Sequence, residues 1–231
     1  MLTKEQLNAL SMALMHTMQA SIVIPMAVVW LRRKHFLPTV KLLSNYVYIS
    51  TFFVVAMTVL YPAYLSTNWW LLAGFNCCKV GLFWAVYRQV LDAAWQRRLL
   101  GVASAFMVLS TVGLYWYNGA LGVAYARIMQ CALLAAVAMA YLEQKMSRAP
   151  TLRLWHDPLW LLSVGQLVYS AGTVTAFSQD YLTVTIYDQT WKYVMVALSG
   201  LAFNWFLTLA FLRAKRELLA PAQPSSQLAT Y

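Results

Sequence analysis

The chain has 231 residues, of which 61% are hydrophobic and 10% are charged, and its formal net charge is +10. Soluble globular proteins carry about 25% charged residues, so this composition excludes a soluble domain and indicates a polytopic membrane protein. Apolar segments use almost the whole length, which leaves no room for a separate catalytic domain. Any function is therefore expected within a helix bundle or on its two faces.

The placement of the basic residues argues against nucleic-acid binding, despite the net charge. Thirteen of the seventeen Lys and Arg residues fall in four clusters: Arg32, Arg33, Lys34 and Lys41; Arg88, Arg97 and Arg98; Lys145, Arg148 and Arg153; Arg213, Lys215 and Arg216. These clusters flank alternate connections, and the positive-inside rule places them in the cytoplasm. The sequence thus predicts a multi-pass protein of the cell membrane, with its N-terminus outside and its C-terminus inside. Anionic phospholipid headgroups are the expected partners of the basic face.

We predict an all-α bundle of seven transmembrane helices within residues 1–218. The expected helices are 6–30, 42–61, 69–90, 99–117, 120–144, 159–177 and 191–212. Segments of about 20 to 25 residues cross a ~30 Å hydrocarbon layer at a rise of ~1.5 Å per residue. The Asn118-Gly119 dipeptide predicts a tight turn between the fourth and fifth helices. The fourth helix is expected to face lipid, and the tail 219–231 is expected to be disordered.

Two cations lie deep within apolar segments that hold no Asp or Glu at similar depth. Lys79 is at the centre of segment 69–90, and Arg127 is eight residues into segment 120–144. A charged side chain at such a depth is costly unless it finds water, a partner or a route to the interface. These two cations are the main indication of function in the sequence.

Three interpretations of the two cations stay open. Each cation could bond backbone carbonyls or nearby amides, or extend to the membrane rim, and serve packing alone. The two could instead form a pocket for a small anionic or polar ligand, open to the outside beneath the loop 178–189. The third interpretation is a long-range ion pair with Asp180 or Asp188 in that loop.

Polar side chains on several helices are candidates to complete the pocket. In the first helix, Asn8, Met12, His16 and Gln19 recur at helical spacing and are expected to face the bundle. A polar stripe in the sixth helix is expected to face protein or water, because lipid would leave its groups unpaired. The candidate ligand-binding residues are Lys79, Arg127, Asn76, Gln130, His16, Gln19, Gln166, Tyr169, Thr173 and Asn204.

The sequence contains no recognisable catalytic or metal-binding constellation. His16, His35 and His156 lie at different depths, and the three cysteines are in apolar segments. The methionines near His16 are explained by packing better than by copper binding. A retinal protein needs a mid-helix lysine in its last helix and carboxylates that move protons, and this pattern is missing. We expect no enzyme activity, no cofactor and no metal.

From the fifth helix onward the chain carries a loose motif. Its residues are Ala126, Arg127, Ile128, Met129 and Gln130, and then Pro158, Leu159 and Trp160 with Gly165, Leu167, Tyr169, Ser170 and Gly172. This pattern resembles an uncharacterised seven-helix family common in Bacteroidota, and the likeness extends back to Tyr46. The resemblance implies seven helices in a bacterial inner membrane and supplies no activity. Family members often carry a carboxylate near the places of Lys79 and Gln130, and its loss here weakens a proton-linked role.

These observations favour a receptor-like or sensory membrane protein that binds a small anionic or polar ligand around Lys79 and Arg127. Its basic inner face would then meet a membrane or cytoplasmic protein partner, because the chain has no output domain of its own. A transporter of small solutes or lipids, along a path between the helices, is the first alternative. A non-catalytic structural subunit of a larger membrane complex is the second.

Overall fold

The computed structural model describes residues 4–60, 69–147, 151–182 and 186–214, and every regular element within these ranges is helical. Seven of the helical segments are long and apolar enough to cross a membrane. The all-α class and the seven spans predicted from the sequence are thereby confirmed. The predicted disordered tail, 219–231, lies outside the described residues.

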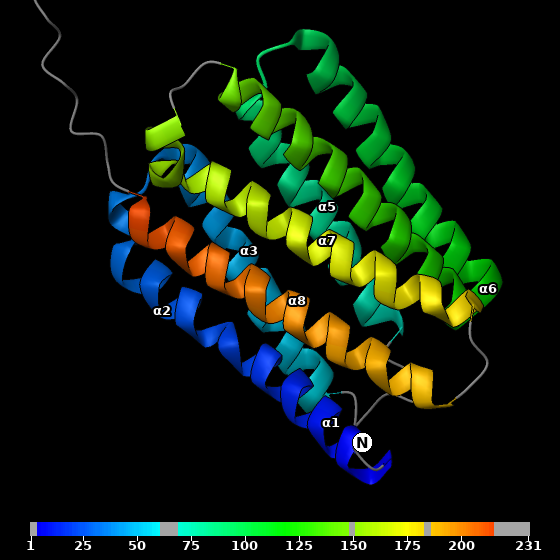
Figure 1. The fold of residues 1–231 in the computed structure, drawn as a ribbon. Helices are drawn as coiled ribbons and strands as arrows, with labels where there is room; N and C mark the ends of the chain where they lie inside the picture. The colour runs from blue at the N-terminus through cyan, green and yellow to red at the C-terminus, as the bar shows by residue number, and fades with distance from the viewer. Residues whose placement is uncertain (1–3, 61–68, 148–150, 183–185, 215–231) are drawn as a thin grey trace, which may run out of the picture.

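The elements follow one another along the chain as a series of long helices with short connections (Figure 1). They are α1 Lys4–Ser21, α2 Val23–Arg32, the 3-10 turn η1 Arg33–His35, α3 Pro38–Val55, the π turn η2 Ala56–Leu60, α5 Trp69–Val90, α6 Ala94–Met146, the 3-10 turn η3 Thr151–His156, α7 Pro158–Leu182 and α8 Ile186–Arg213. Together, α1, α2 and η1 make one span, Glu5–His35.

The first span is interrupted between α1 and α2. Pro25 has no backbone N–H to donate to the Ser21 carbonyl, and its ring crowds that carbonyl. The regular helical hydrogen bonding is therefore interrupted one turn before Pro25. Ile22 keeps helical backbone angles of φ −64° and ψ −20°, and the chain continues in nearly the same direction. The helix predicted over 6–30 is thus one span with a local irregularity at Ile22, where α1 gives way to α2.

The long helix α6 contains two spans, Ala94–Gly119 and Ala124–Met146. Gly119 has φ 54° and ψ −120°, a conformation that residues with a side chain rarely adopt, and it reverses the chain there. The two halves run back along each other (Figure 1). This is the hairpin that the Asn118-Gly119 dipeptide predicted.

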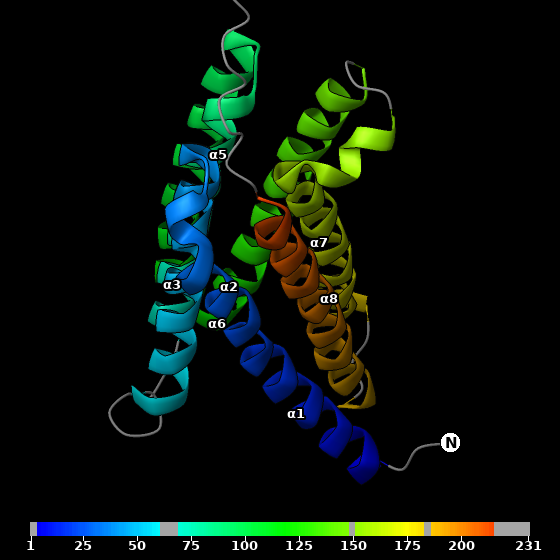
Figure 2. The same cartoon turned by 90° about the vertical axis from the view of Figure 1, so that its left-hand side faces the viewer.

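The bundle has two sides, with α3 and α5 on one and α7 and α8 on the other (Figure 2). The helix pair α1–α2 bridges them by packing on α8 and on α3, while α6 contacts both α5 and α7. A continuous cluster of buried side chains fills the space between the sides, and it includes Tyr46, Phe83, Tyr87, Phe203 and Phe211. Large apolar side chains on the first half of α6 are exposed, as expected for a lipid-facing wall.

Several of the described basic residues gather at the end of the bundle where α2, α6 and α8 end. Arg32 donates a hydrogen bond of 2.7 Å to the Leu212 carbonyl, and Arg213 donates one to the Trp155 carbonyl. Lys145 forms an ion pair of 3.0 Å with Asp157 at the start of α7. These contacts join the ends of five elements into one basic face, opposite the end at which α1 begins (Figure 1).

Candidate functional site

The Lys79 ammonium lies inside a cage of four aromatic rings, one from each of four helices. Its Nζ is 4.1 Å from the ring centroid of Tyr169 in α7, 5.1 Å from Phe203 in α8, 5.7 Å from Phe83 in α5 and 5.8 Å from Tyr46 in α3. Lys79 is only 3% exposed. Ring faces attract a cation through their negative quadrupole, so the cage partly offsets the loss of hydration.

The four rings also hold one another in place. The Tyr46 ring meets the rings of Phe83 and Phe203 edge to face, at centroid distances of 5.7 Å in both cases. Tyr169 packs on Phe203 at 5.6 Å. Edge-to-face pairs of this kind are favourable beyond simple burial, so the cage is a rigid part of the core.

Arg127 in the second half of α6 contacts the same tyrosine at its hydroxyl group. Its Nη2 donates a hydrogen bond of 2.9 Å to the Tyr169 hydroxyl, and its guanidinium carbon lies 5.3 Å from the Phe177 ring centroid. Within the described residues, neither Arg127 nor Lys79 forms an ion pair with a carboxylate. Tyr169 is thus the common partner of both cations. The predicted pairing with Asp180 or Asp188 concerns side chains outside the described part of the chain.

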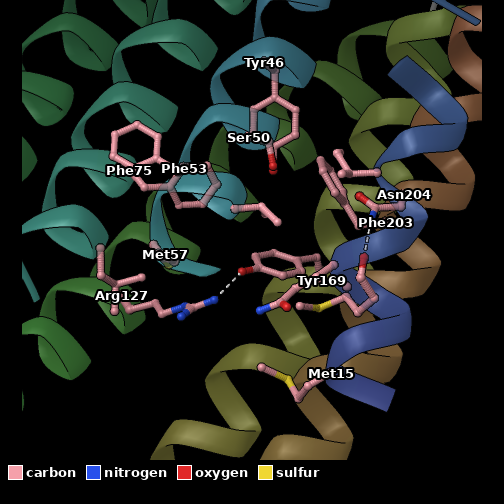
Figure 3. A pocket seen from close by; sticks show the side chains of 16 residues that line it. Met15, Tyr46, Ser50, Phe53, Met57, Phe75, Arg127, Tyr169, Phe203 and Asn204 are labelled. Atoms are coloured by element: carbon pink, nitrogen blue, oxygen red, sulfur yellow. Dashed lines mark hydrogen bonds between the residues drawn. The ribbon is translucent and has the colours of Figure 1, made fainter. Parts of the chain in front are cut away.

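A cavity of about 170 Å³ opens beside this arrangement, and Figure 3 shows Arg127 and Tyr169 at its edge. An apolar cavity of ~150 Å³ holds a benzene molecule, so a small organic ligand fits. The cavity is mainly apolar, and its apolar lining residues are Met15, Met18, Ile22, Phe53, Val54, Met57, Leu72, Phe75 and Phe203. Lys79 does not line it, because Tyr46, Tyr169 and Phe203 line it in its place. The guanidinium of Arg127 is the charged group at the cavity wall.

Irregular helix segments shape this cavity on two sides. The break between α1 and α2 places Ile22 in its lining, and the π turn η2 places Met57 there. π turns are rare and are often found at functional sites, because they rotate side chains out of the regular helical register. The amides of Gln19 and Asn204 add polar groups to the wall.

Asn204 connects α8 to α1. Its Nδ2 donates hydrogen bonds to the Met18 carbonyl at 3.2 Å and to the Ser21 hydroxyl at 2.7 Å. Met18 also packs directly on Gly200, where an added Cβ would lie 2.3 Å from the Met18 sulfur. These contacts fix the rotation of α1 on α8.

With this rotation, the face of α1 that packs on the bundle differs from the one expected from the sequence. Met12 is 63% exposed and His16 is exposed as well, whereas Leu7 and Ser11 are buried. The expectation that Met12 and His16 face the bundle is therefore wrong. Of the predicted face, Gln19 reaches the cavity and His16 is not among its lining residues.

Four other candidates are buried where α5, α6 and α7 meet, away from the cavity lining. Gln130 donates a hydrogen bond of 3.2 Å to the Asn76 carbonyl, and Gln166 donates one of 2.9 Å to the Ser170 hydroxyl. The Asn76 Nδ2, the Gln166 Oε1 and the Thr173 Oγ1 have no hydrogen-bond partner among the described residues. The Gln130–Asn76 bond joins α6 to α5, whereas Gln166 and Ser170 both belong to α7.

The structure thus brings four of the ten sequence candidates to the cavity: Arg127, Tyr169, Gln19 and Asn204. The sequence reasoning missed Tyr46 and Phe203, which belong both to the cage and to the cavity wall. Aromatic residues make up 15% of the chain, so their type alone gave no signal. Within the described residues, no group of three or more His, Cys, Asp or Glu side chains is placed to hold a metal ion.

Comparisons of the chain with protein families, with curated proteins and with solved structures found no match. The resemblance to a Bacteroidota seven-helix family therefore stays a prediction.

Proposed function

We propose that this chain is a receptor-like membrane protein that binds a small apolar monoanion in the cavity beside Arg127. One observation carries the proposal: the Arg127 guanidinium lines a mainly apolar cavity, and it donates a hydrogen bond to the Tyr169 hydroxyl. A guanidinium has five N–H donors, and carboxylates accept two of them in a planar fork. A small carboxylate with an apolar body matches both the charge and the lining.

In this proposal Lys79 does not contact the ligand and acts on it through its charge. Its ammonium lies on the ring face of Tyr169, while Arg127 bonds the hydroxyl of the same ring. The caged cation keeps a positive charge close to the cavity in a medium of low dielectric constant, where charges interact strongly. It favours an anion over a neutral ligand without touching either.

The side from which the ligand enters follows from the basic face. Arg32, Lys145 and Arg213 lie together at one end of the bundle, and basic connections stay in the cytoplasm. The cavity is lined by Met15, Met18 and Gln19 of α1 and by Leu72 near the start of α5, on the side away from that face. We infer an N-terminus outside and a cavity in the outer half of the cell membrane.

The test is ligand-dependent thermal stabilisation of the full-length protein in detergent, with benzoate and hexanoate as anionic probes and benzamide and hexanol as neutral ones. A ligand that binds only the folded state raises the melting temperature with its concentration. We expect the anions to stabilise the protein more than the neutral probes, and Arg127→Met to remove that preference. Lys41→Met, which removes an exposed cation at the basic face, should retain it. An equal shift for all four probes, or none, contradicts the proposal.

Transport is a second candidate, favoured by the two irregular helices at the cavity. Interrupted helices that line a central site are typical of secondary transporters. Here the α1–α2 break and the π turn after α3 both contribute lining residues. Flux of radiolabelled benzoate into proteoliposomes separates the two functions, since a receptor binds the anion without moving it.

A further inference from the structure

A second cavity, of about 330 Å³, lies where α5 ends and α6 begins, at the basic face. Its six lining residues are Trp84, Arg88, Ala94, Arg97, Arg98 and Gly101. Half of this lining is arginine. The three guanidinium groups come from two helices that the short connection after Val90 holds together.

The positive charge of this cavity comes from Arg88, Arg97 and Arg98, and Asp92 in the connection between the two helices is the carboxylate nearest to them in sequence. Within the described residues, none of its three arginines forms an ion pair with a carboxylate. The Arg88 guanidinium carbon lies 5.3 Å from the Trp84 ring centroid, which orients the group without cancelling its charge. Three like charges held close together repel one another, and an anion between them relieves that repulsion.

A buried donor in the cavity wall is also without an acceptor. The Trp84 indole Nε1 is buried and has no hydrogen-bond partner among the described residues. It faces Gly101, where an added Cβ would lie 3.4 Å from that nitrogen. Buried donors are normally bonded, so this indole N–H is an exception in the cavity wall, and it lies beside the three arginines.

The three guanidinium groups fit a phosphate group, whose oxygens accept several hydrogen bonds and pair bidentately with guanidinium. An apolar track leads away from the cavity along the lipid-facing side of α6: Trp95 is 65% exposed, Leu99 60%, Val102 69% and Phe106 62%. Eleven residues of helix rise by about 16 Å, comparable to the depth of one membrane leaflet. A phosphate carried by a lipid therefore meets donors at the headgroup level and apolar surface below it.

We propose that this cavity binds the phosphate of an anionic phospholipid, with the acyl chains lying along the exposed side of α6. Basic pockets between membrane helices on the cytoplasmic side are suited to lipid headgroups of this charge. This site is separate from the Arg127 cavity, and neither proposal depends on the other.

The experiment measures thermal stabilisation of the full-length protein in detergent by three probes: phosphatidylglycerol, phosphatidylcholine with the same acyl chains, and inorganic phosphate. We expect phosphatidylglycerol to stabilise the protein at concentrations at least about tenfold lower than either other probe. Arg97→Gln combined with Arg98→Gln should weaken this apparent affinity about tenfold or more, because charge-assisted hydrogen bonds are lost.

A second variant tests the cavity without changing its charge. Gly101→Leu fills the space in front of Trp84 and should also abolish the lipid-dependent shift. Gly113→Leu, in the same span and with nothing within 4 Å of an added Cβ, should keep it. Equal stabilisation by inorganic phosphate would show a free phosphate as the occupant and overturn the lipid proposal. An unchanged lipid shift in both the arginine variant and Gly101→Leu would overturn the site itself.

Discussion

The Tyr169 ring lies 4.1 Å from the Lys79 ammonium, and its hydroxyl accepts a hydrogen bond of 2.9 Å from Arg127. One side chain therefore contacts both cations of the membrane interior through two different parts of its structure. Removing the hydroxyl alters only the contact with Arg127, whereas removing the ring alters both. This separation makes the two contacts individually testable.

Tyr169→Phe should lower the free energy of unfolding by about 1 to 2 kcal/mol, because Arg127 loses its acceptor while the ring over Lys79 remains. The measurement is reversible unfolding in mixed micelles. In the Arg127→Met background the same change should cost close to nothing, since the partner is already gone. Tyr117→Phe, at a tyrosine that is 87% exposed, is the matched control. Equal costs in both backgrounds would mean that the hydrogen bond has no energetic role.

Lys79→Met should leave the stability unchanged or raise it. The replacement fills similar space among the rings, makes favourable sulfur–aromatic contacts and removes a desolvated charge. Lys79→Ala should instead cost about 2 kcal/mol or more relative to Met, because it leaves a cavity inside the ring cage. Unfolding of the two variants side by side gives the comparison. A Met variant as unstable as the Ala variant would show that the charge itself stabilises the fold.

Gly172→Ala and Gly165→Ala should each destabilise the bundle by about 1 to 3 kcal/mol, the usual cost of overpacking. An added Cβ would lie 2.5 Å from the Ser199 Cβ at the first position and 2.6 Å from the Phe206 Cβ at the second, so α7 and α8 must separate. Gly113→Ala has open space around its Cβ and should gain up to about 1 kcal/mol from helix propensity. Melting temperatures of the three variants give the test, and equal values would contradict close packing of α7 on α8.

Asp157→Ala should cost more stability than Asp157→Asn. The Asp157 Oδ1 accepts a hydrogen bond of 2.9 Å from the Leu159 backbone N–H and so caps α7. The Asp157 Oδ2 accepts a hydrogen bond of 2.9 Å from the Tyr141 hydroxyl and forms an ion pair with Lys145. Asparagine is as good an N-cap as aspartate, and alanine loses the cap at a cost of about 0.5 to 2 kcal/mol. Equal melting temperatures for the two variants would argue against the capping role.

The proposed orientation predicts which connections are accessible from outside the cell. In a background without the native cysteines, Asn118→Cys should react with a membrane-impermeant maleimide on intact cells. Lys34→Cys should react only after lysis, because it belongs to the basic face. Both positions are exposed, so burial does not limit either reaction. The reverse pattern would invert the topology and place the Arg127 cavity on the cytoplasmic side.

The sequence by itself determined the class of the protein, the seven spans and the reversal at Gly119. These are local properties, because the effect of an apolar run of about 20 residues, or of a turn dipeptide, does not depend on distant residues. It also identified Lys79 and Arg127 as the unusual groups, because the cost of a cation in hydrocarbon rises with its depth, which can be counted along the segment.

Only the tertiary structure decided which side chains surround those cations. Lys79 is caged by rings from four helices, and this places it behind the cavity wall instead of on it. His16 faces outward because Met18 packs on Gly200 and sets the rotation of α1. Helix rotation in a membrane is set by packing against neighbouring helices, and hydropathy along one chain segment carries no information about it.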